Sequence, residues 1–212
     1  LLEPVRLVTR FPRLAECPRG EGNPLLVLPG FGASDRSTWM LRRYLSWLGY
    51  CVEPWKLGRN HGRVGELLPR VVERLESTAE QHGGPVGLVG WSLGGYLARE
   101  AARERPKLVS HVVTLGSPVV GGPKYTLASR YYIRNGYDLD EIEANVAARD
   151  EVPLEVPVTA IYSRRDGVVA WQACIDLVNR ATEHVEVEST HLGLGFSPDV
   201  FAVVADRLGS AR

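Results

Sequence analysis

A serine set between glycines is the residue of this sequence with the clearest chemical potential. The stretch Gly90-Trp91-Ser92-Leu93-Gly94 follows the apolar residues 86–89 and precedes a third glycine and a helical pattern. A serine at a sharp turn between a strand and a helix projects its hydroxyl above the sheet edge, which requires minimal side chains two positions away on each side. Gly90 and Gly94 meet this requirement. The pattern therefore predicts that Ser92 is a nucleophile.

Two backbone N–H groups could stabilise the negative charge that attack by this serine would create. The N–H of Leu93 is expected at a helix N-terminus, where unpaired donors and the helix dipole favour an anion. The N–H of Phe31, in Pro29-Gly30-Phe31-Gly32, is the second candidate, because the glycines let the backbone approach a substrate oxygen closely. The alternative for the second segment is an ordinary glycine turn.

A serine hydroxyl is a poor nucleophile at neutral pH, so a base and a group that orients it are required. Asp166 follows the predicted strand 156–162, and His191 follows the predicted strand 185–188. The order serine, acid, histidine, with each residue in a loop after a strand, is the order expected for this type of turn. We predict that His191 is the base and that Asp166 orients it.

The remaining acids, serines and histidines fit these roles less well. The other four histidines precede Ser92 or lie at a predicted strand edge: His61, His82, His111 and His184. Asp176 is expected on the solvated face of a predicted helix, and Ser117 is interpreted as a turn residue that lines the pocket. Three more aspartates, Asp138, Asp140 and Asp150, lie in a long connecting segment.

The elements that must position these residues alternate between short apolar runs and amphipathic segments. Runs rich in leucine and β-branched residues predict strands at 25–28, 50–53, 86–89, 109–115, 156–162 and 185–188. Apolar residues at helical spacing predict helices at 38–48, 66–81, 93–105, 170–179 and 198–208. This alternation is typical of an α/β fold, so we expect a mostly parallel sheet of about six strands with helices on both faces.

Residues 117–152 depart from the alternation. They contain Gly121, Gly122, several tyrosines and acidic residues, with little strand character. A connection of this length usually carries its own helices or a function. We interpret it as an insertion over the sheet and as a candidate cap above Ser92. The alternative is a pair of surface helices that never touches the substrate.

The composition excludes several classes of protein. The 212 residues are 44% hydrophobic and 24% charged, with a net charge of +0, which indicates a soluble globular chain and gives no reason to expect a nucleic-acid partner. The length favours one domain spanning 1–212, given about 150 residues per domain. The three cysteines lack metal-ligand spacing, so no metal or cofactor is expected, although one disulfide stays open.

The sequence says less about location and assembly. The apolar run 25–28 is the longest near the N-terminus and falls far short of the roughly 18 residues of a membrane span. A cytoplasmic location is favoured, but secretion stays open because the chain begins at Leu1 rather than at methionine. The oligomeric state is left open.

These motifs resemble those of the α/β-hydrolase superfamily, in particular small bacterial lipases and carboxylesterases, across roughly residues 25–208. The resemblance implies the same roles for Ser92, Asp166 and His191, and a main-chain oxyanion hole at Phe31 and Leu93. Many lipases have His-Gly where this chain has Pro29-Gly30, and others have alanine where it has Gly90. The two antiparallel strands that begin the full-length fold are missing or reduced to a remnant at residues 5–10.

The leading functional hypothesis is a serine hydrolase that cleaves carboxylic esters through an acyl-enzyme, without a metal. An apolar acyl group is expected, with pocket candidates Phe31, Trp91, Val119, Val120, Val168 and Trp171. The same triad also serves thioesterases, amidases, perhydrolases and carbon–carbon bond hydrolases, because fold and triad do not determine the substrate. A noncatalytic, hydrolase-like binding module is the alternative from a different class.

Overall fold

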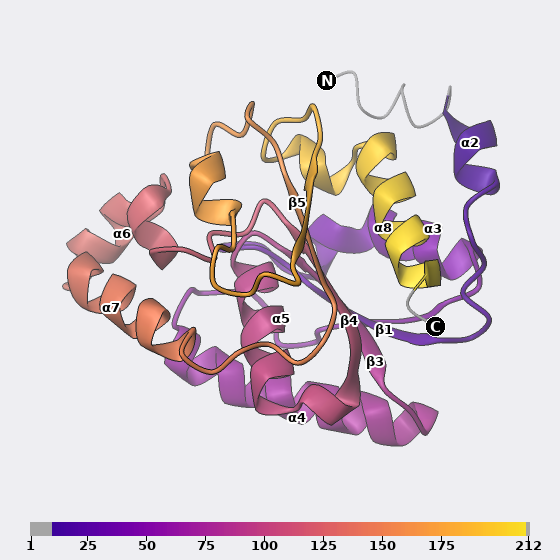
Figure 1. The fold of residues 1–212 in the computed structure, drawn as a ribbon, viewed down its shortest axis with the longest axis horizontal. Helices are drawn as coiled ribbons and strands as arrows, with labels where there is room; N and C mark the ends of the chain where they lie inside the picture. The colour runs from indigo at the N-terminus through magenta and orange to yellow at the C-terminus, as the bar shows by residue number, and fades with distance from the viewer. Residues whose placement is uncertain (1–9, 211–212) are drawn as a thin grey trace.

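The computed structural model describes residues 10–210, and a six-stranded, fully parallel sheet runs through its centre (Figure 1). The order across the sheet is β2-β1-β3-β4-β5-β6. The strands are β1 (Pro24–Leu28), β2 (Cys51–Pro54), β3 (Val86–Trp91), β4 (Val109–Leu115), β5 (Val158–Tyr162) and β6 (Glu183–Glu186). Because every pair is parallel, the loops that follow β1, β3, β5 and β6 all leave the sheet at the same edge.

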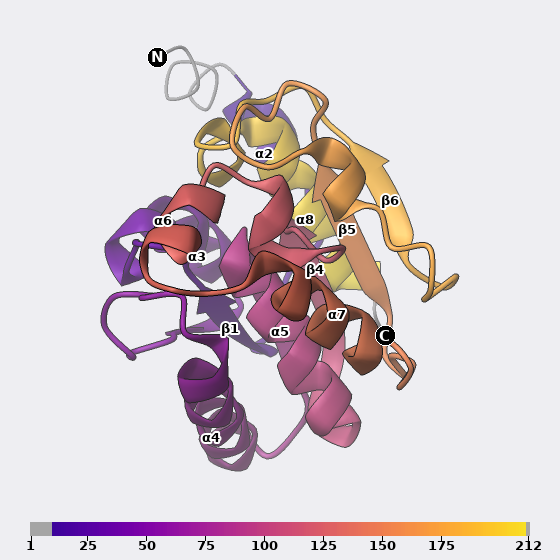
Figure 2. The same cartoon turned by 90° about the vertical axis from the view of Figure 1, so that its left-hand side faces the viewer.

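Helices cover both faces of this sheet (Figures 1 and 2). The helices are α2 (Phe11–Ala15), α3 (Trp39–Trp47), α4 (Val64–His82), α5 (Leu93–Glu104), α6 (Ser129–Arg134), α7 (Leu139–Arg149) and α8 (Pro198–Ser210). One apolar cluster joins the sheet to α3 and α8, and another joins it to α4 and α5. A central strand is therefore buried on both sides, which explains why the runs that predicted β1 and β3 contain no polar side chains.

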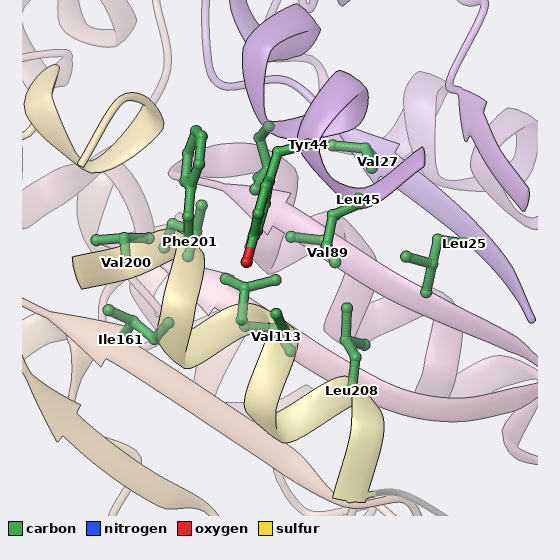
Figure 3. Close-up of a cluster of buried hydrophobic side chains, with 14 of the residues drawn as sticks. Leu25, Val27, Tyr44, Leu45, Val89, Val113, Ile161, Val200, Phe201 and Leu208 are labelled. Atoms are coloured by element: carbon green, nitrogen blue, oxygen red, sulfur yellow. The ribbon is translucent and has the colours of Figure 1, made fainter. Parts of the chain in front are cut away.

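The core between the sheet, α3 and α8 is built around a pair of aromatic rings (Figure 3). Tyr44 of α3 stacks on Phe201 of α8, with 5.4 Å between ring centroids. Val89, Val113 and Ile161, from three neighbouring strands, form the floor of this cluster. Both helices are thereby fixed to the strands whose carboxyl ends precede the predicted site residues.

The predicted fold class is confirmed, whereas the predicted helix at 170–179 is wrong. That stretch contains only a short 3₁₀ turn, Trp171–Cys174. The Asp176 carboxylate accepts hydrogen bonds from the N–H groups of Val178 and Asn179, at 3.0 and 2.9 Å, and so competes with a helical ladder. In addition, β6 begins and ends two residues earlier than predicted. Most of the proposed remnant at residues 5–10 lies outside the described residues, and Arg10 belongs to a turn before α2.

The segment 117–152 carries a 3₁₀ turn (Gly122–Tyr125), α6 and α7. Both views place α7 beside α5 (Figures 1 and 2). Ion pairs join the two helices: Arg103 of α5 contacts Asp150 at 2.7 Å, and Arg149 contacts Glu104 at 3.1 Å. The C-terminal end of the segment is thus attached to the helix that follows Ser92.

Candidate active site

Ser92 occupies a strained backbone position between β3 and α5. Trp91 is the last residue of the strand and Leu93 is the first of the helix. Ser92 has φ 53° and ψ −123°, a conformation that side-chain-bearing residues rarely adopt. Strain of this kind persists only where the surroundings impose it, and it gathers at functional sites.

The glycines that flank Ser92 are required by close backbone contacts. A Cβ at Gly90 would lie 2.3 Å from the Cα of Gly95, and a Cβ at Gly94 would lie 2.5 Å from the carbonyl oxygen of Leu28. Neither distance leaves room for a methyl group. The start of α5 therefore packs directly against β1 and β3, which is the close approach that the sequence pattern predicts.

Asp166 and His191 meet at the same edge of the sheet. The Nδ1 of His191 lies 2.6 Å from Oδ2 of Asp166, and the two side chains are 8% and 1% exposed. The other carboxylate oxygen accepts hydrogen bonds from the N–H groups of Val168 and Val169, each at 2.8 Å. These bonds hold the carboxylate as the acceptor, so that Nδ1 of His191 donates and Nε2 is available as a base.

A cavity of about 890 Å³ lies beside the serine and the histidine, whereas Asp166 does not line it. Ser92 and His191 both line it, together with Phe31 and Leu93. A Cβ at Gly30 would lie 3.2 Å from Cβ of Ser92, so the loop after β1 runs directly past the serine. The arrangement places a hydroxyl, an oriented imidazole and two backbone segments with candidate N–H donors around one space, which is the set that acyl transfer requires.

The predicted pocket residues divide into two groups. Three of them, Phe31, Trp91 and Val168, line the cavity, and the other three lie outside it: Val119, Val120 and Trp171. The N–H groups of Val119 and Val120 both donate to the carbonyl of Ala173, at 2.8 and 3.0 Å, which holds these two residues against the 3₁₀ turn 171–174, whereas the neighbouring Pro118 and Gly122 line the cavity.

Trp171 is held elsewhere by its own contacts. Its ring stacks on Tyr162, with 5.9 Å between centroids, and the Arg164 guanidinium lies 4.6 Å from the ring centroid. Ser117 is also misplaced by the sequence interpretation, because it is 1% exposed and does not line the cavity. Its hydroxyl occupies the space beside Gly95, where a Cβ would lie 2.0 Å away.

Asp176 is not the solvated residue that the sequence predicts. It is 5% exposed and pairs with Arg99 of α5 at 2.7 Å. Burial acts to raise the pKa of its carboxyl, but Arg99 and the N–H donors of Asn179 and Val178 outweigh this effect and hold the pKa below its usual value. Asp176 therefore has a structural role at α5 rather than a place beside Ser92.

Sequence reasoning missed the apolar wall of the cavity that lies farther from the serine. Tyr96, one turn along α5 from Ser92, lines the cavity together with Val64 and Leu68 of α4 and with Ile142 and Val146 of α7. The i, i+4 spacing of the pairs on α4 and α7 puts each pair on one helix face. That spacing is the signal from which these residues could have been found.

Other reactive groups fit the chemistry less well. Burial raises the pKa of the Cys174 thiol to about 12, so that thiol stays protonated at neutral pH. All three cysteines are free thiols.

Within residues 10–210 there is no cluster of three or more histidine, cysteine, aspartate or glutamate side chains that could hold a metal ion. No helix in the same part of the chain is long and apolar enough to cross a membrane.

Comparison with known proteins identifies relatives of this fold and sequence. The mitochondrial palmitoyl-protein thioesterase ABHD10 of mouse is 29% identical over 140 residues, which cover 55% of this chain and 46% of that protein. Its bovine counterpart is 23% identical over 196 residues, covering 76% of this chain and 63% of that protein. This chain thus spans less than two thirds of the length of the curated relatives it matches.

Solved structures share the fold of this chain. A monoacylglycerol lipase from Paleococcus ferrophilus superimposes with a TM-score of 0.67 at 15% identity, covering 92% of this chain and 97% of the lipase chain. The family model described as the alpha/beta hydrolase family matches residues 25–207, which include every residue of the site described above. The chain therefore belongs to the alpha/beta hydrolase family.

Proposed function

We propose that this protein hydrolyses carboxylic esters through a covalent acyl-enzyme formed on Ser92. The observation that carries the proposal is the 2.6 Å contact between Asp166 and His191, which lines a cavity together with Ser92. A carboxylate on Nδ1 fixes the imidazole tautomer whose Nε2 accepts a proton, and this is the property that a serine nucleophile needs. The strained turn at Ser92 supports the same role.

The reaction then proceeds in two balanced halves. The Ser92 hydroxyl oxygen attacks the acyl carbon while Nε2 of His191 takes the hydroxyl proton, and the carbonyl oxygen becomes an oxyanion facing the N–H groups of Phe31 and Leu93. Collapse of this intermediate breaks the ester bond, and His191 gives its proton to the leaving alcohol. Water next attacks the acyl-enzyme with His191 again as the base, which releases the acid and restores the serine.

The far part of the cavity suits an apolar acyl chain. Its walls there come from Leu68 of α4, Tyr96 of α5 and the pair Ile142 and Val146 of α7. Ligand pockets of this size, roughly 300–1,000 Å³, are usually lined mainly by apolar groups with a few polar ones at the reacting end. We assign the acyl chain to the space between α5 and α7, and the segment 117–152 is proposed as a cap that forms one side of it.

A thioester is the second candidate substrate. The mouse and bovine relatives are both named palmitoyl-protein thioesterases. The same residues would act on a thioester, and the leaving thiolate depends less on protonation by His191 than an alkoxide does because a thiol is the stronger acid. The same catalytic residues would serve both substrates, so only measured turnover of esters and of thioesters distinguishes the two functions.

The proposal is tested with p-nitrophenyl esters and matching S-acyl thioesters of increasing chain length. We expect hydrolysis by the wild-type protein, and loss of most turnover in both Ser92→Ala and His191→Ala with the fold retained, because the triad acts as a unit. Wild-type activity in Ser92→Ala would refute the proposal, as would absence of activity on every ester and thioester.

The acyl site has its own matched pair of variants. Ile142→Trp fills the cavity between α5 and α7 and is expected to weaken turnover of long acyl chains while acetyl esters are still cleaved. Ile133→Trp makes the same exchange on α6, at a side chain that is 59% exposed and outside the cavity. This control is expected to change neither the turnover of long acyl chains nor that of acetyl esters. Equal effects on acetyl and long-chain esters would contradict the assignment.

A further inference from the structure

The loop that carries the Phe31 N–H is held from outside by residues of the segment that precedes α4. The loop closes on itself through one bond, from the N–H of Ala33 to the carbonyl of Gly30, at 3.1 Å. Gly32 has φ +73°, a conformation natural to glycine. A single turn of this kind is flexible, so its position beside Ser92 depends on the contacts that it makes with its neighbours.

Asn60 supplies these contacts on both sides of Phe31. Its side-chain amide donates to the carbonyl of Pro29 at 2.9 Å. Its carbonyl accepts from the N–H of Gly32 at 2.7 Å, and its own N–H donates to the carbonyl of Ala33 at 2.8 Å. Asn60 is 0% exposed, so these bonds do not compete with water.

Gly62 links this arrangement to α6. Its N–H donates to Oδ1 of Asn60 at 3.2 Å, and its carbonyl accepts from the Tyr132 hydroxyl at 2.8 Å. Gly62 has φ +84°, and a Cβ there would lie 2.6 Å from that hydroxyl and 2.7 Å from the ring of Phe31. Tyr132 is 6% exposed although it belongs to the segment 117–152. The α6 helix, the segment around Asn60 and the loop of Phe31 therefore meet without space between them.

We propose that Asn60 is a positioning residue for the oxyanion donor at Phe31, and that Tyr132, through Gly62, makes the position of this donor depend on the docking of α6. This inference rests on the proposed function. When α6 is docked, the Tyr132 hydroxyl fixes the carbonyl of Gly62 and thereby the amide of Asn60. The bonds from Asn60 to Pro29, Gly32 and Ala33 then fix the plane of the peptide group that carries the Phe31 N–H.

The distribution of these bonds favours positioning over general stabilisation. Asn60 bonds the loop at residues on either side of Phe31 and leaves the Phe31 N–H itself unused: among residues 10–210, no hydrogen bond from that N–H is found. A donor that is free but immobile is what an oxyanion hole requires, because it then needs no reorganisation during the reaction.

Two variants test the inference on p-nitrophenyl acetate, the ester with the shortest acyl chain of the series. Asn60→Ala removes the bond to Pro29, and we expect kcat to fall by about 10- to 100-fold with little change in KM, given that removing one oxyanion donor outright costs ~10²–10³. Tyr132→Phe removes only the hydroxyl, and a roughly three- to tenfold fall in kcat is expected from a small misplacement of the donor. Rates are referred to active sites counted with a fluorophosphonate.

The second readout is the inhibition constant of a trifluoromethyl ketone, which forms a tetrahedral oxyanion on a serine. It should rise by the same factor as kcat/KM falls, since both report stabilisation of the oxyanion. Tyr125→Phe is the matched control, because it removes a hydroxyl that bonds Glu143 at 2.8 Å within the segment 117–152 and is outside the cavity, and both constants should stay unchanged.

The outcomes separate the inference from the function on which it rests. Unchanged kcat in both variants of an active enzyme overturns the inference alone, as does a loss of kcat without a matching rise in the ketone's inhibition constant. If Asn60→Ala does not fold, Tyr132→Phe decides, with parallel changes in both constants supporting the inference and no change overturning it. A wild-type protein that neither cleaves esters or thioesters nor binds the ketone refutes the proposed function, and the inference fails with it.

Discussion

Gly116, the residue that follows β4, provides a sharp test of the Asp166–His191 pair. A Cβ at this position would lie 3.0 Å from Oδ2 of Asp166 and 3.2 Å from Nδ1 of His191. These are the two atoms that form the 2.6 Å hydrogen bond. The nearest atom to this Cβ is Cδ1 of Leu194, a buried side chain, at 2.7 Å. In Gly116→Ala, the new methyl group must therefore displace the Leu194 side chain and also press on the carboxylate and the imidazole, which have to give by a few tenths of an ångström.

Gly116→Ala is expected to lower both stability and catalysis. Gly116 has φ +56°, so alanine there adds backbone strain of roughly 1–2 kcal/mol. In a domain of this size, that strain lowers Tm by about 2–8 °C. Misalignment of the base, in contrast, lowers kcat by about 10- to 100-fold, because rates respond steeply to small errors in the position of a catalytic group.

Gly22→Ala separates the two effects. Gly22 has φ +83°, it lies in the turn before β1, and a methyl group added there would have no heavy atom within 4 Å. We expect this control to lose the stability that backbone strain alone costs and to keep the wild-type kcat, whereas Gly116→Ala also loses stability through its contact with Leu194. Thermal denaturation and steady-state kinetics on one short ester measure both quantities. If Gly116→Ala keeps the same kcat as Gly22→Ala, the assignment of Asp166 and His191 to the reaction is refuted.

Three further predictions concern stability and cofactor dependence. Asp176→Asn should destabilise the fold by at most about 3–5 kcal/mol, the cost of leaving a buried charge unpaired, because Arg99 keeps Asp150 as a partner at 3.5 Å. Calorimetry should find Tm lower by at most roughly 6–20 °C. Burial lowers the pKa of His111 in the folded protein, whereas the pKa of a histidine in the unfolded chain is about 6.5. The stability that the neutral His111 contributes is therefore complete above about pH 6.5 and is lost as the pH falls below it, because the unfolded chain then binds the proton more readily. Urea denaturation from pH 5 to 8 should therefore show a shallower acid limb for His111→Gln, and identical curves would contradict this. Dialysis against EDTA should leave ester hydrolysis unchanged, because the proposed mechanism takes its nucleophile from Ser92 and its base from His191, and recovery of lost activity by added metal would contradict the mechanism.

The sheet could be predicted from the sequence because burial on both faces leaves a simple pattern. β1 and β3 are nearly continuous apolar runs, and parallel pairing fixes the edge at which their following loops emerge. The same rule brings Ser92, Asp166 and His191 to one edge without any knowledge of side-chain contacts. Position after a strand is therefore enough to predict that these three residues lie at one edge, and their catalytic roles are part of the proposal.

The cavity wall could not be predicted in the same way because it depends on long-range packing. Val119 and Trp171 are apolar and close in sequence to site loops, but hydrogen bonds to Ala173 and stacking on Tyr162 turn them elsewhere. Ile142 reaches the cavity because α7 is attached to α5, partly through ion pairs between residues some 47 positions apart in the chain. Periodicity predicts which side of a helix is apolar but does not say which element will cover it.

The helix predicted at 170–179 failed for a related reason. Apolar residues occur there at suitable spacing, but Asp176 bonds the local N–H groups and its charge is drawn toward Arg99, 77 residues away in the chain. A local propensity is overridden when a buried partner fixes the side chain in another conformation. The sequence of residues 170–179 does not indicate that Asp176 will pair with an arginine so far away in the chain.

The central claim, that Ser92 is a nucleophile activated by His191, is tested most directly by covalent labelling. The intact protein is incubated with a fluorophosphonate, and mass spectrometry locates and counts the adduct. If Ser92 is the nucleophile and His191 its base, we expect one adduct per chain, on Ser92. No adduct should form in Ser92→Ala, and labelling should be strongly slowed in His191→Ala. An adduct on another residue, or labelling of Ser92 at the wild-type rate without His191, would contradict it.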